Sequence, residues 1–156
     1  MIKVNVEVDR KPWRNKLKNP KKYIFKKLKK INRVIPTLKG KNFTFTILLT
    51  NYLRMKKLNK KFRNHNKSTD VLSFPSFQLK KLRLKEQKNI YIGDIAICYE
   101  IIKARSKKSN FFIEFDKVWI HGFLHLLGYN HIKNKEYFIM NKIEKKIFNL
   151  ISKKRS

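Results

Sequence analysis

The sequence predicts an α/β fold with some α+β character: one domain in which about five helices pack around a small mixed sheet of four strands. Segments with strand character alternate with segments with helix character, which favours parallel strands joined by helical crossovers. Residues 71–74 and 90–98 are successive strand-like segments compatible with a hairpin, so the sheet should be mixed. The 156 residues, 42% of them hydrophobic, suffice for one core. We therefore expect one domain over residues 1–152 and a frayed basic tail at 153–156.

The N-terminal part of the chain predicts a strand followed by an amphipathic helix. Residues 2–8 alternate apolar and polar side chains, which is the pattern of a half-buried strand. Asn19 and Pro20 suit an N-cap and a first helical turn, and the helix should continue to Pro36. Its apolar face is a stripe of four aliphatic residues at helical spacing: Ile24, Leu28, Ile31 and Ile35.

The middle of the chain predicts three strands and one helix. Residues 43–49 are rich in β-branched and aromatic side chains, as strands are, and Thr50 or Asn51 can cap the helix that follows. The hairpin strands then flank a charged connection, residues 78–89, which we expect to be a mobile loop. The helix before the hairpin should turn four residues toward the core: Tyr52, Met55, Leu58 and Phe62.

The C-terminal part predicts three helices. Residues 99–108 form a short one, and a longer one follows at 115–127, where dense apolar side chains without proline suit a helix buried on most sides. Gly128 should end that helix, because positive φ at a helix C-terminus is least strained in glycine. The last helix opens at Asn134 or Lys135 and runs through Met140, Ile143, Ile147 and Leu150.

Three of the four histidines lie close together at the end of the predicted helix 115–127. His121 and His125 are one helical turn apart and share a face, and a reversal at Gly128 can return His131 to the same point. Three neutral imidazoles can bind zinc and leave its fourth tetrahedral position to water, as catalytic zinc sites do. The alternative, ordinary polar residues on a half-buried helix, is less consistent with three histidines at this spacing. We predict one zinc ion per chain.

The same histidine spacing occurs in the H-E-x-x-H-x-x-G-x-x-H pattern of metzincin proteases, but one position differs. Where the protease pattern has a glutamate that serves as general base, this chain has Gly122. Zinc therefore remains the expected metal, while peptide hydrolysis is disfavoured. The single cysteine, Cys98, cannot build a cysteine-rich structural site.

The charge of the chain indicates a polyanionic partner. A formal net charge of +30 would attract nucleic acid over distances that the salt concentration sets. Of the 40 basic residues 32 are lysine, so solvated lysine faces produced by an A/T-biased coding sequence are the alternative. No stretch approaches the ~18 apolar residues of a membrane span, and the N-terminus lacks a signal-peptide layout. We expect a cytoplasmic protein that has no membrane partner.

Metal-activated water suits the cleavage of a phosphate ester. Zinc can lower the pKa of bound water to about 7 and act as a Lewis acid on a phosphoryl oxygen, so a carboxylate base is not required. Arg63 ends the second predicted helix, where it can project over the sheet edge and fork onto phosphate, although a solvated arginine is the alternative. Asp70 and Asp94 are more typical of turns and strand ends than of catalysis. The carboxylates considered as a general base are Asp70, Glu86, Asp94, Glu100, Glu114 and Asp116.

Four segments in order carry a family resemblance: L-N-K-K-F-R at 58–63, S-T-D-V-L-S-F-P at 68–75, I-G-D-I-A-I-C at 92–98 and H-G-F-L-H-L-L-G-Y-N-H at 121–131. With them the chain resembles the bacterial YbeY endoribonucleases, also called ribosomal RNA maturation factors. The resemblance implies helices around a small mixed sheet, and one metal, usually zinc, bound by His121, His125 and His131 in a positively charged cleft. It also implies a functional arginine at Arg63. We expect no small-molecule cofactor. The implied substrate is single-stranded RNA, in the maturation of small-subunit (16S) ribosomal RNA at its 3′ end and in ribosome quality control.

Asn130 departs from the family pattern, because family members commonly have aspartate immediately before the third histidine. If that carboxylate orients a metal-bound imidazole, its loss would weaken metal binding by roughly 10- to 100-fold. If it only caps a turn, asparagine serves equally. We favour the turn, since Asn and Asp share turn preferences.

Two other functions are consistent with some of the same residues. In the first, a non-catalytic assembly factor, the zinc would be structural and the charge would dock the protein on ribosomal RNA of the small subunit. The second is a metalloprotease, which Gly122 disfavours. Removal of the metal separates catalytic from structural zinc, because only structural zinc is needed for folding.

Overall fold

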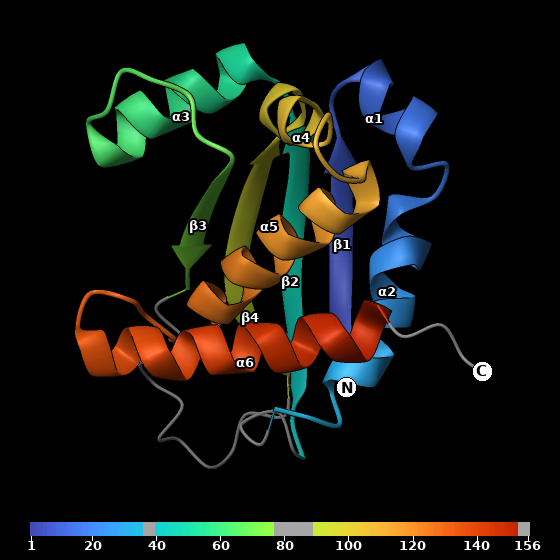
Figure 1. Ribbon diagram of the computed structural model, residues 1–156, viewed down its shortest axis with the longest axis vertical. Coiled ribbons are helices and arrows are strands. Elements are labelled where there is room, and N and C mark those ends of the chain that lie inside the picture. The colour runs from blue at the N-terminus through green and yellow to red at the C-terminus, as the bar shows by residue number, and fades with distance from the viewer. Residues whose placement is uncertain (36–39, 77–88, 153–156) are drawn as a thin grey trace.

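The computed structural model describes residues 1–35, 40–76 and 89–152 (Figure 1). β1, β2 and β4 are parallel, and β3 is antiparallel to β4, which confirms the predicted mixed sheet. The predicted loop at 78–89 lies outside the described residues except for Asn89, and the predicted tail at 153–156 lies outside them entirely. The sheet has the order β1-β2-β4-β3, with β1 at Ile2–Val8, β2 at Asn42–Thr50, β3 at Val71–Pro75 and β4 at Asn89–Cys98.

The described part of the chain has six helices, one more than the sequence predicted: α1 (Lys11–Lys16), α2 (Pro20–Ile31), α3 (Tyr52–Arg63), α4 (Tyr99–Arg105), α5 (Phe111–Leu126) and α6 (Asn134–Ser152). Figure 1 shows α5 running across one face of the sheet, with α6 lying across α5 and α2 beside β1. None of these helices is long and apolar enough to cross a membrane.

The main core lies between the sheet and α5. Side chains alternate across a strand, so Ile95 and Ile97 join the core beneath α5, whereas Ala96 and Cys98 join a smaller cluster that includes Met55 of α3. The helix α3 therefore packs on the opposite face of the sheet from α5. The largest fully buried side chains of the main core are aromatic: Trp13, Trp119, Phe43, Phe45, Phe115 and Phe123.

The short helix α1 was not predicted. Its Trp13 is fully buried, and the indole Nε1 donates a hydrogen bond to the carbonyl oxygen of Thr50 at the end of β2 (2.8 Å). Pro12 stands in the first turn, where proline has a favourable φ and lacks only an N–H that would be unpaired anyway. A proline suited to a first helical turn, followed by a large apolar residue, was the sequence signal for this helix that the prediction overlooked.

The helix α2 begins at Pro20 as predicted but ends at Ile31, about one turn before the expected stop at Pro36. The chain leaves the helix through turns, in which the Val34 N–H donates to the Ile31 carbonyl (2.9 Å). Proline disfavours the helical conformation of the residue before it, Ile35, and this restriction by itself does not account for the end of the helix at Ile31. Ile35 is nevertheless buried, as predicted, because the turns after α2 bring it into the main core.

The core-facing side of α3 differs from the prediction. Tyr52 and Phe62 are 44% and 53% exposed, so placing them in the core was wrong. Met55 and Asn59 are the buried residues of this helix, and the Asn59 amide donates to the Lys67 carbonyl (2.7 Å), which compensates its burial. Because α3 packs against the sheet along a narrow strip, only residues of that strip are covered.

Candidate metal centre

The end of α5 positions the histidine cluster. Gly128 has φ +89°, as its place after the helix predicted. Its N–H donates to the His125 carbonyl (3.0 Å), and the Tyr129 N–H donates to the Leu124 carbonyl (3.1 Å). This pair of bonds is the Schellman arrangement, which satisfies the last carbonyls of a helix and reverses the chain. The reversal returns His131 to the face of α5 that carries the other two histidines.

The structure brings the three predicted ligands together. The ring centroids are 4.6 Å apart for His121 and His125, 4.9 Å for His125 and His131, and 5.5 Å for His121 and His131. One nitrogen of each ring can be chosen so that all three lie within 4.8 Å of one another. The cluster could therefore hold a metal ion.

Hydrogen bonds on the outer side of two rings fix which nitrogen faces inward. Nδ1 of His121 lies 2.6 Å from a Glu144 carboxylate oxygen, and Nδ1 of His125 lies 3.0 Å from the Tyr129 carbonyl oxygen. Both oxygens can accept from Nδ1, so in neutral rings of this tautomer Nδ1 carries the proton and Nε2 keeps its lone pair. The two Nε2 atoms are 3.0 Å apart, close to the roughly 3.3 Å that tetrahedral zinc with ~2.05 Å bonds requires. A cation between them relieves the facing lone pairs, so the donor set fits a metal.

The surroundings of His125 favour the neutral imidazole that a metal needs. Burial lowers the pKa of His125 because it disfavours the charged ring. The positive charges that His121 and His131 can carry act in the same direction. The hydrogen bond to Tyr129 opposes this shift without reversing it.

Glu144 is the site residue that sequence reasoning missed. It lies in the third turn of α6, and its contact with His121 depends on how α6 crosses α5 rather than on any local pattern. Asn130, whose role the sequence left between a turn and an imidazole partner, contacts the backbone. Its side-chain oxygen accepts the backbone N–H of His131 (2.9 Å), so the described contact of Asn130 is with the backbone of the third histidine.

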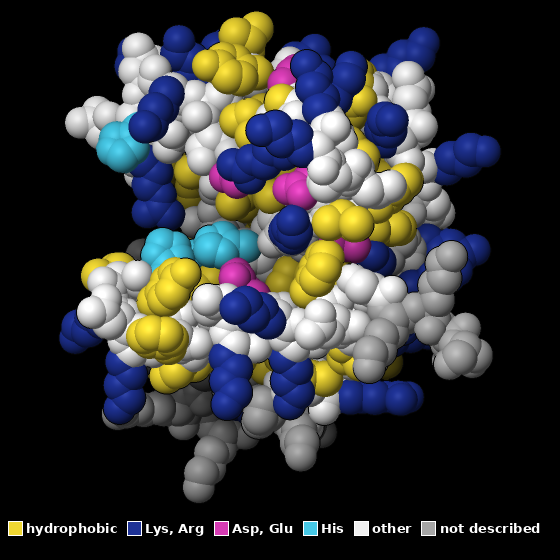
Figure 2. All heavy atoms as spheres, in the orientation of Figure 1, with side chains coloured by type: hydrophobic (Ala, Val, Ile, Leu, Met, Phe, Trp, Pro, Cys, Tyr) yellow, Lys and Arg dark blue, Asp and Glu magenta, His cyan; other side chains and the backbone are white. Residues whose placement is uncertain are grey.

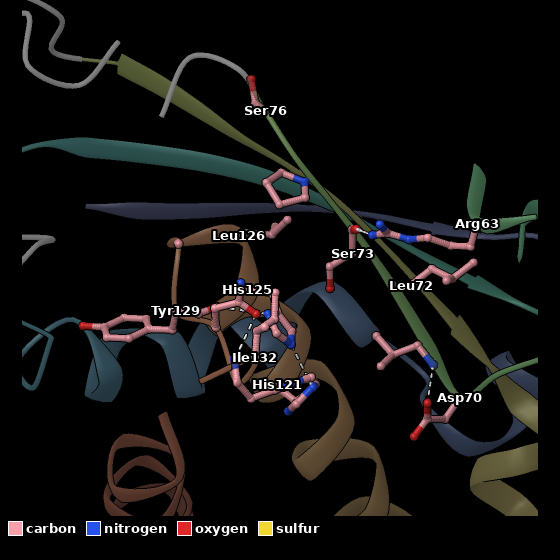
Figure 3. Close-up of a pocket in the computed structure, with 15 residues that line it drawn as sticks. Arg63, Asp70, Leu72, Ser73, Ser76, His121, His125, Leu126, Tyr129 and Ile132 are labelled. Atoms are coloured by element: carbon pink, nitrogen blue, oxygen red, sulfur yellow. Dashed lines mark hydrogen bonds between the residues drawn. The ribbon is translucent and has the colours of Figure 1, made fainter. Parts of the chain in front are cut away.

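A cavity of about 810 Å³ opens in front of the histidines. Figure 2 shows histidine side chains at a hollow above the N-terminal half of α6, and Figure 3 shows the cavity with Ser73 lying between the histidines and Arg63. A guanidinium Nη2 of Arg63 donates to the Ser73 carbonyl (3.0 Å), which holds the arginine against β3. The lining comprises Arg63, Asp70, Val71, Leu72, Ser73, Pro75, Ser76, His121, His125, Leu126, Gly128, Tyr129, Asn130, His131 and Ile132.

Asp70 is the candidate carboxylate that lines this cavity, but its oxygens already have partners. One oxygen pairs with Arg105 (2.6 Å), and the other accepts the Val71 N–H (2.8 Å). These contacts fit the start of a strand, as the sequence suggested for Asp70. Glu86 lies outside the described residues, and the remaining candidates, which do not line the cavity, are Asp94, Glu100, Glu114 and Asp116.

Gly122 faces the sheet rather than the cavity. A Cβ atom there would lie 3.0 Å from Ile95 Cγ2 and 3.1 Å from Ser73 Oγ, which is tighter than most contacts in proteins. The carbonyl of Gly122 also accepts a hydrogen bond from the Ser73 hydroxyl (3.3 Å). Gly122 does not line the histidine cavity and has no carboxylate, so this position does not supply the general base of the protease pattern.

Comparisons with known proteins agree with the geometry. The family model described as endoribonuclease YbeY matches residues 6–152. An endoribonuclease YbeY of Pelagibacter ubique is 42% identical in an alignment of 158 positions that covers 99% of each chain. One from Buchnera aphidicola is 40% identical over 130 residues, covering 82% of this chain and 79% of the relative. The solution structure of TM1509 from Thermotoga maritima is 27% identical with a TM-score of 0.60, covering 97% of this chain and 89% of that one.

Proposed function

Since this chain belongs to the YbeY endoribonuclease family, we propose that it is a zinc-dependent enzyme that cuts single-stranded RNA. We further propose that it acts in the cytoplasm with the small ribosomal subunit, where it matures the 3′ end of the 16S ribosomal RNA and takes part in ribosome quality control. The observation that carries the proposal is that the three histidines and Arg63 line one cavity.

His121, His125 and His131 would hold the zinc, the first two through Nε2. When bound, zinc supplies a Lewis acid and lowers the pKa of a coordinated water to about 7. Glu144 and the Tyr129 carbonyl hold the two imidazoles with their lone pairs turned inward.

Arg63 would bind the scissile phosphate from the β3 side of the cavity. In the described contacts, Nη2 of its guanidinium donates to the Ser73 carbonyl, so the other N–H groups can bind phosphate oxygens. A fixed guanidinium stabilises the negative charge that builds on these oxygens as the bond breaks. Its hydrogen bond to Ser73 would keep the guanidinium beside the cavity before RNA binds.

A catalytic zinc is favoured over a structural one by the number of ligands. Among the described residues the cluster contains three histidines and no additional His, Cys, Asp or Glu, whereas structural zinc sites are closed by four protein ligands. Cys98 is buried on the other side of the sheet in the cluster beneath α3. The histidine set thus leaves a coordination position open.

The test is cleavage of end-labelled RNA that spans the 3′ end of the small-subunit ribosomal RNA, by zinc-loaded protein beside His121→Ala and Arg63→Ala prepared identically. We expect the native protein to cleave, His121→Ala to lose both zinc and cleavage, and Arg63→Ala to keep zinc but lose cleavage. Equal cleavage by all three would indicate a contaminating nuclease. Unfolding of the native protein on chelation would instead support the non-catalytic assembly factor with structural zinc.

A further inference from the structure

The segment that follows the third histidine exposes an apolar group. Ile132, Tyr137 and Phe138 are 78%, 51% and 70% exposed. Single exposed apolar side chains are ordinary, but several that lie together mark an interaction site. We call these three residues the apolar platform.

One residue of the apolar platform, Ile132, borders the histidine cavity. Ile132 follows His131 directly and lines the cavity with it. Tyr137 and Phe138 stand in the first turns of α6, with ring centroids 6.0 Å apart and planes inclined by 75°. Figure 2 shows hydrophobic side chains at this end of α6 beside the histidines. The platform therefore extends the wall of the cavity outward onto the surface of the molecule.

Cations accompany the platform. Lys133 and Lys135 are exposed within the same segment. The acidic residue of this segment, Glu136, accepts a hydrogen bond from the Lys133 backbone N–H through a carboxylate oxygen (3.3 Å). Aromatic rings beside lysines are the combination that binds single-stranded nucleic acid, with rings under the bases and cations on the phosphates. A second copy of this chain is a poor occupant, since each copy carries a formal charge of +30.

We propose that Tyr137 and Phe138, with Ile132 beside them, stack against unpaired bases of the RNA strand where it passes from the cavity onto α6. Lys133 and Lys135 bind the phosphates of the same nucleotides. This assignment rests on the proposed ribonuclease function and adds a base-binding subsite to it. Every base has a π face, so the subsite holds unpaired RNA with little sequence preference and disfavours paired bases, whose faces are already stacked.

The test compares two labelled RNA strands of equal length, one of uridines and one whose internal nucleotides lack bases, in fluorescence anisotropy titrations. Stacking on the platform should make the native protein bind the uridine strand about 5- to 100-fold more tightly. The double variant Tyr137→Ala/Phe138→Ala should lose that preference while keeping the salt dependence of binding. Leu53→Ala, which removes a 66% exposed side chain on α3, is the matched control and should behave as the native protein does.

The outcomes separate this subsite from the ribonuclease itself. If the native protein cleaves RNA and the double variant retains the preference for bases, the platform does not bind bases, although the nuclease stands. If the native protein neither binds nor cleaves RNA, the proposed function fails and the subsite fails with it. If the double variant loses binding to phosphatidylserine vesicles instead of RNA, the platform is a membrane surface and the assignment is wrong. Unchanged thermal unfolding of the double variant excludes a folding defect.

Discussion

Glu144 is the residue of α6 that contacts one member of the histidine cluster, His121. Its carboxylate holds Nδ1 of His121 at 2.6 Å, which turns Nε2 toward His125. If the proposed zinc ion is bound by these histidines, we expect Glu144→Ala to weaken its binding by about 10- to 100-fold, the range typical of partners that orient metal ligands. Glu144→Gln, whose amide oxygen can still accept from Nδ1, should lose less. Competition with a chromophoric zinc chelator measures both.

Glu7→Ala is the control for this substitution, because Glu7 is an exposed carboxylate on β1. It should bind zinc as the native protein does. If Glu144→Ala also keeps native zinc affinity, the contact with His121 does not orient the metal ligand.

The difference between Glu144 and the three histidines shows what a sequence can reveal about a site. The histidines are readable because helical spacing and one glycine bring them together within residues 121–131. Glu144 joins them only through the packing of α6 on α5, and its surroundings in the sequence resemble those of any exposed helical glutamate. Arg63 lies between these cases: its position at the end of a predicted helix suggested that it projects over the sheet edge, with a solvated arginine as the alternative, and the family resemblance implied a functional role.

At the scale of elements, α5 can approach the sheet closely because Gly122 has no side chain. A methyl group there would crowd Ile95, Ser73 and Val71 at 3.0 to 3.2 Å. Overpacking costs about 2 kcal/mol, whereas alanine gains about 1 kcal/mol over glycine in a helix. We therefore expect Gly122→Ala to lower the free energy of unfolding by about 1 kcal/mol, and Gly122→Val to lower it further. Urea denaturation gives both values.

Lys117 provides the matched site for this series, because it lies on the exposed side of α5. Lys117→Ala and Lys117→Val report the difference in helix propensity without the contact with the sheet. If the Ala-to-Val step costs the same at position 122 as at position 117, crowding against the sheet is not the reason for glycine there.

The helices α2 and α5 are joined through a buried polar network. Asp116 of α5 accepts hydrogen bonds from Tyr23 (3.1 Å) and Trp119 (2.9 Å) and forms an ion pair with Lys27. Its side chain is 7% exposed and that of Lys27 is 19% exposed. Removing one member of a buried pair strands the other charge, so Asp116→Asn should cost about 3 kcal/mol of unfolding free energy.

A double-mutant cycle with Lys27→Met isolates the ion pair, and we expect a coupling free energy of at least about 1 kcal/mol. The pair Lys117 and Glu114 is the control, because Lys117 is 53% exposed and the pair is confined to one helix (3.0 Å). Its coupling should stay below about 0.5 kcal/mol. Equal couplings in the two cycles would mean that the buried pair does not join the helices more strongly than a surface pair.

Features of the helices and strands were predicted correctly where interactions between residues close in sequence define them, and were missed where packing between distant segments defines them. The strand at 2–8 was predicted from its alternation of apolar and polar side chains, and the end of α5 from a glycine that tolerates positive φ. Both signals lie within a few neighbouring residues. The exposure of Tyr52 and Phe62 was missed because it depends on how much of α3 the sheet covers. The periodicity of a helix identifies an apolar side but does not give the width of the neighbouring surface.

On the scale of the whole molecule, the excess of basic residues is spread over the surface. Figure 2 shows lysine and arginine side chains around the hollow that contains the histidines, and also far from it. A net charge of +30 creates repulsion within the folded chain that the core must offset. Binding a polyanion relieves this repulsion, which favours the complex with RNA at low salt.

The salt dependence of RNA binding tests whether these cations contact phosphates. Each phosphate neutralised on a single strand adds about 0.7 to the slope of log Kd against log salt concentration. About six contacts would therefore weaken binding roughly 300-fold between about 50 and 200 mM salt. Lys133→Gln with Lys135→Gln should lower the slope by about 1.4, whereas Lys21→Gln with Lys22→Gln on α2, beside β1 and away from the cavity, should leave it nearly unchanged. A flat dependence for the native protein, or equal changes in the two pairs, would mean that the lysines form a general solvated surface and that no cationic path leads RNA to the histidines.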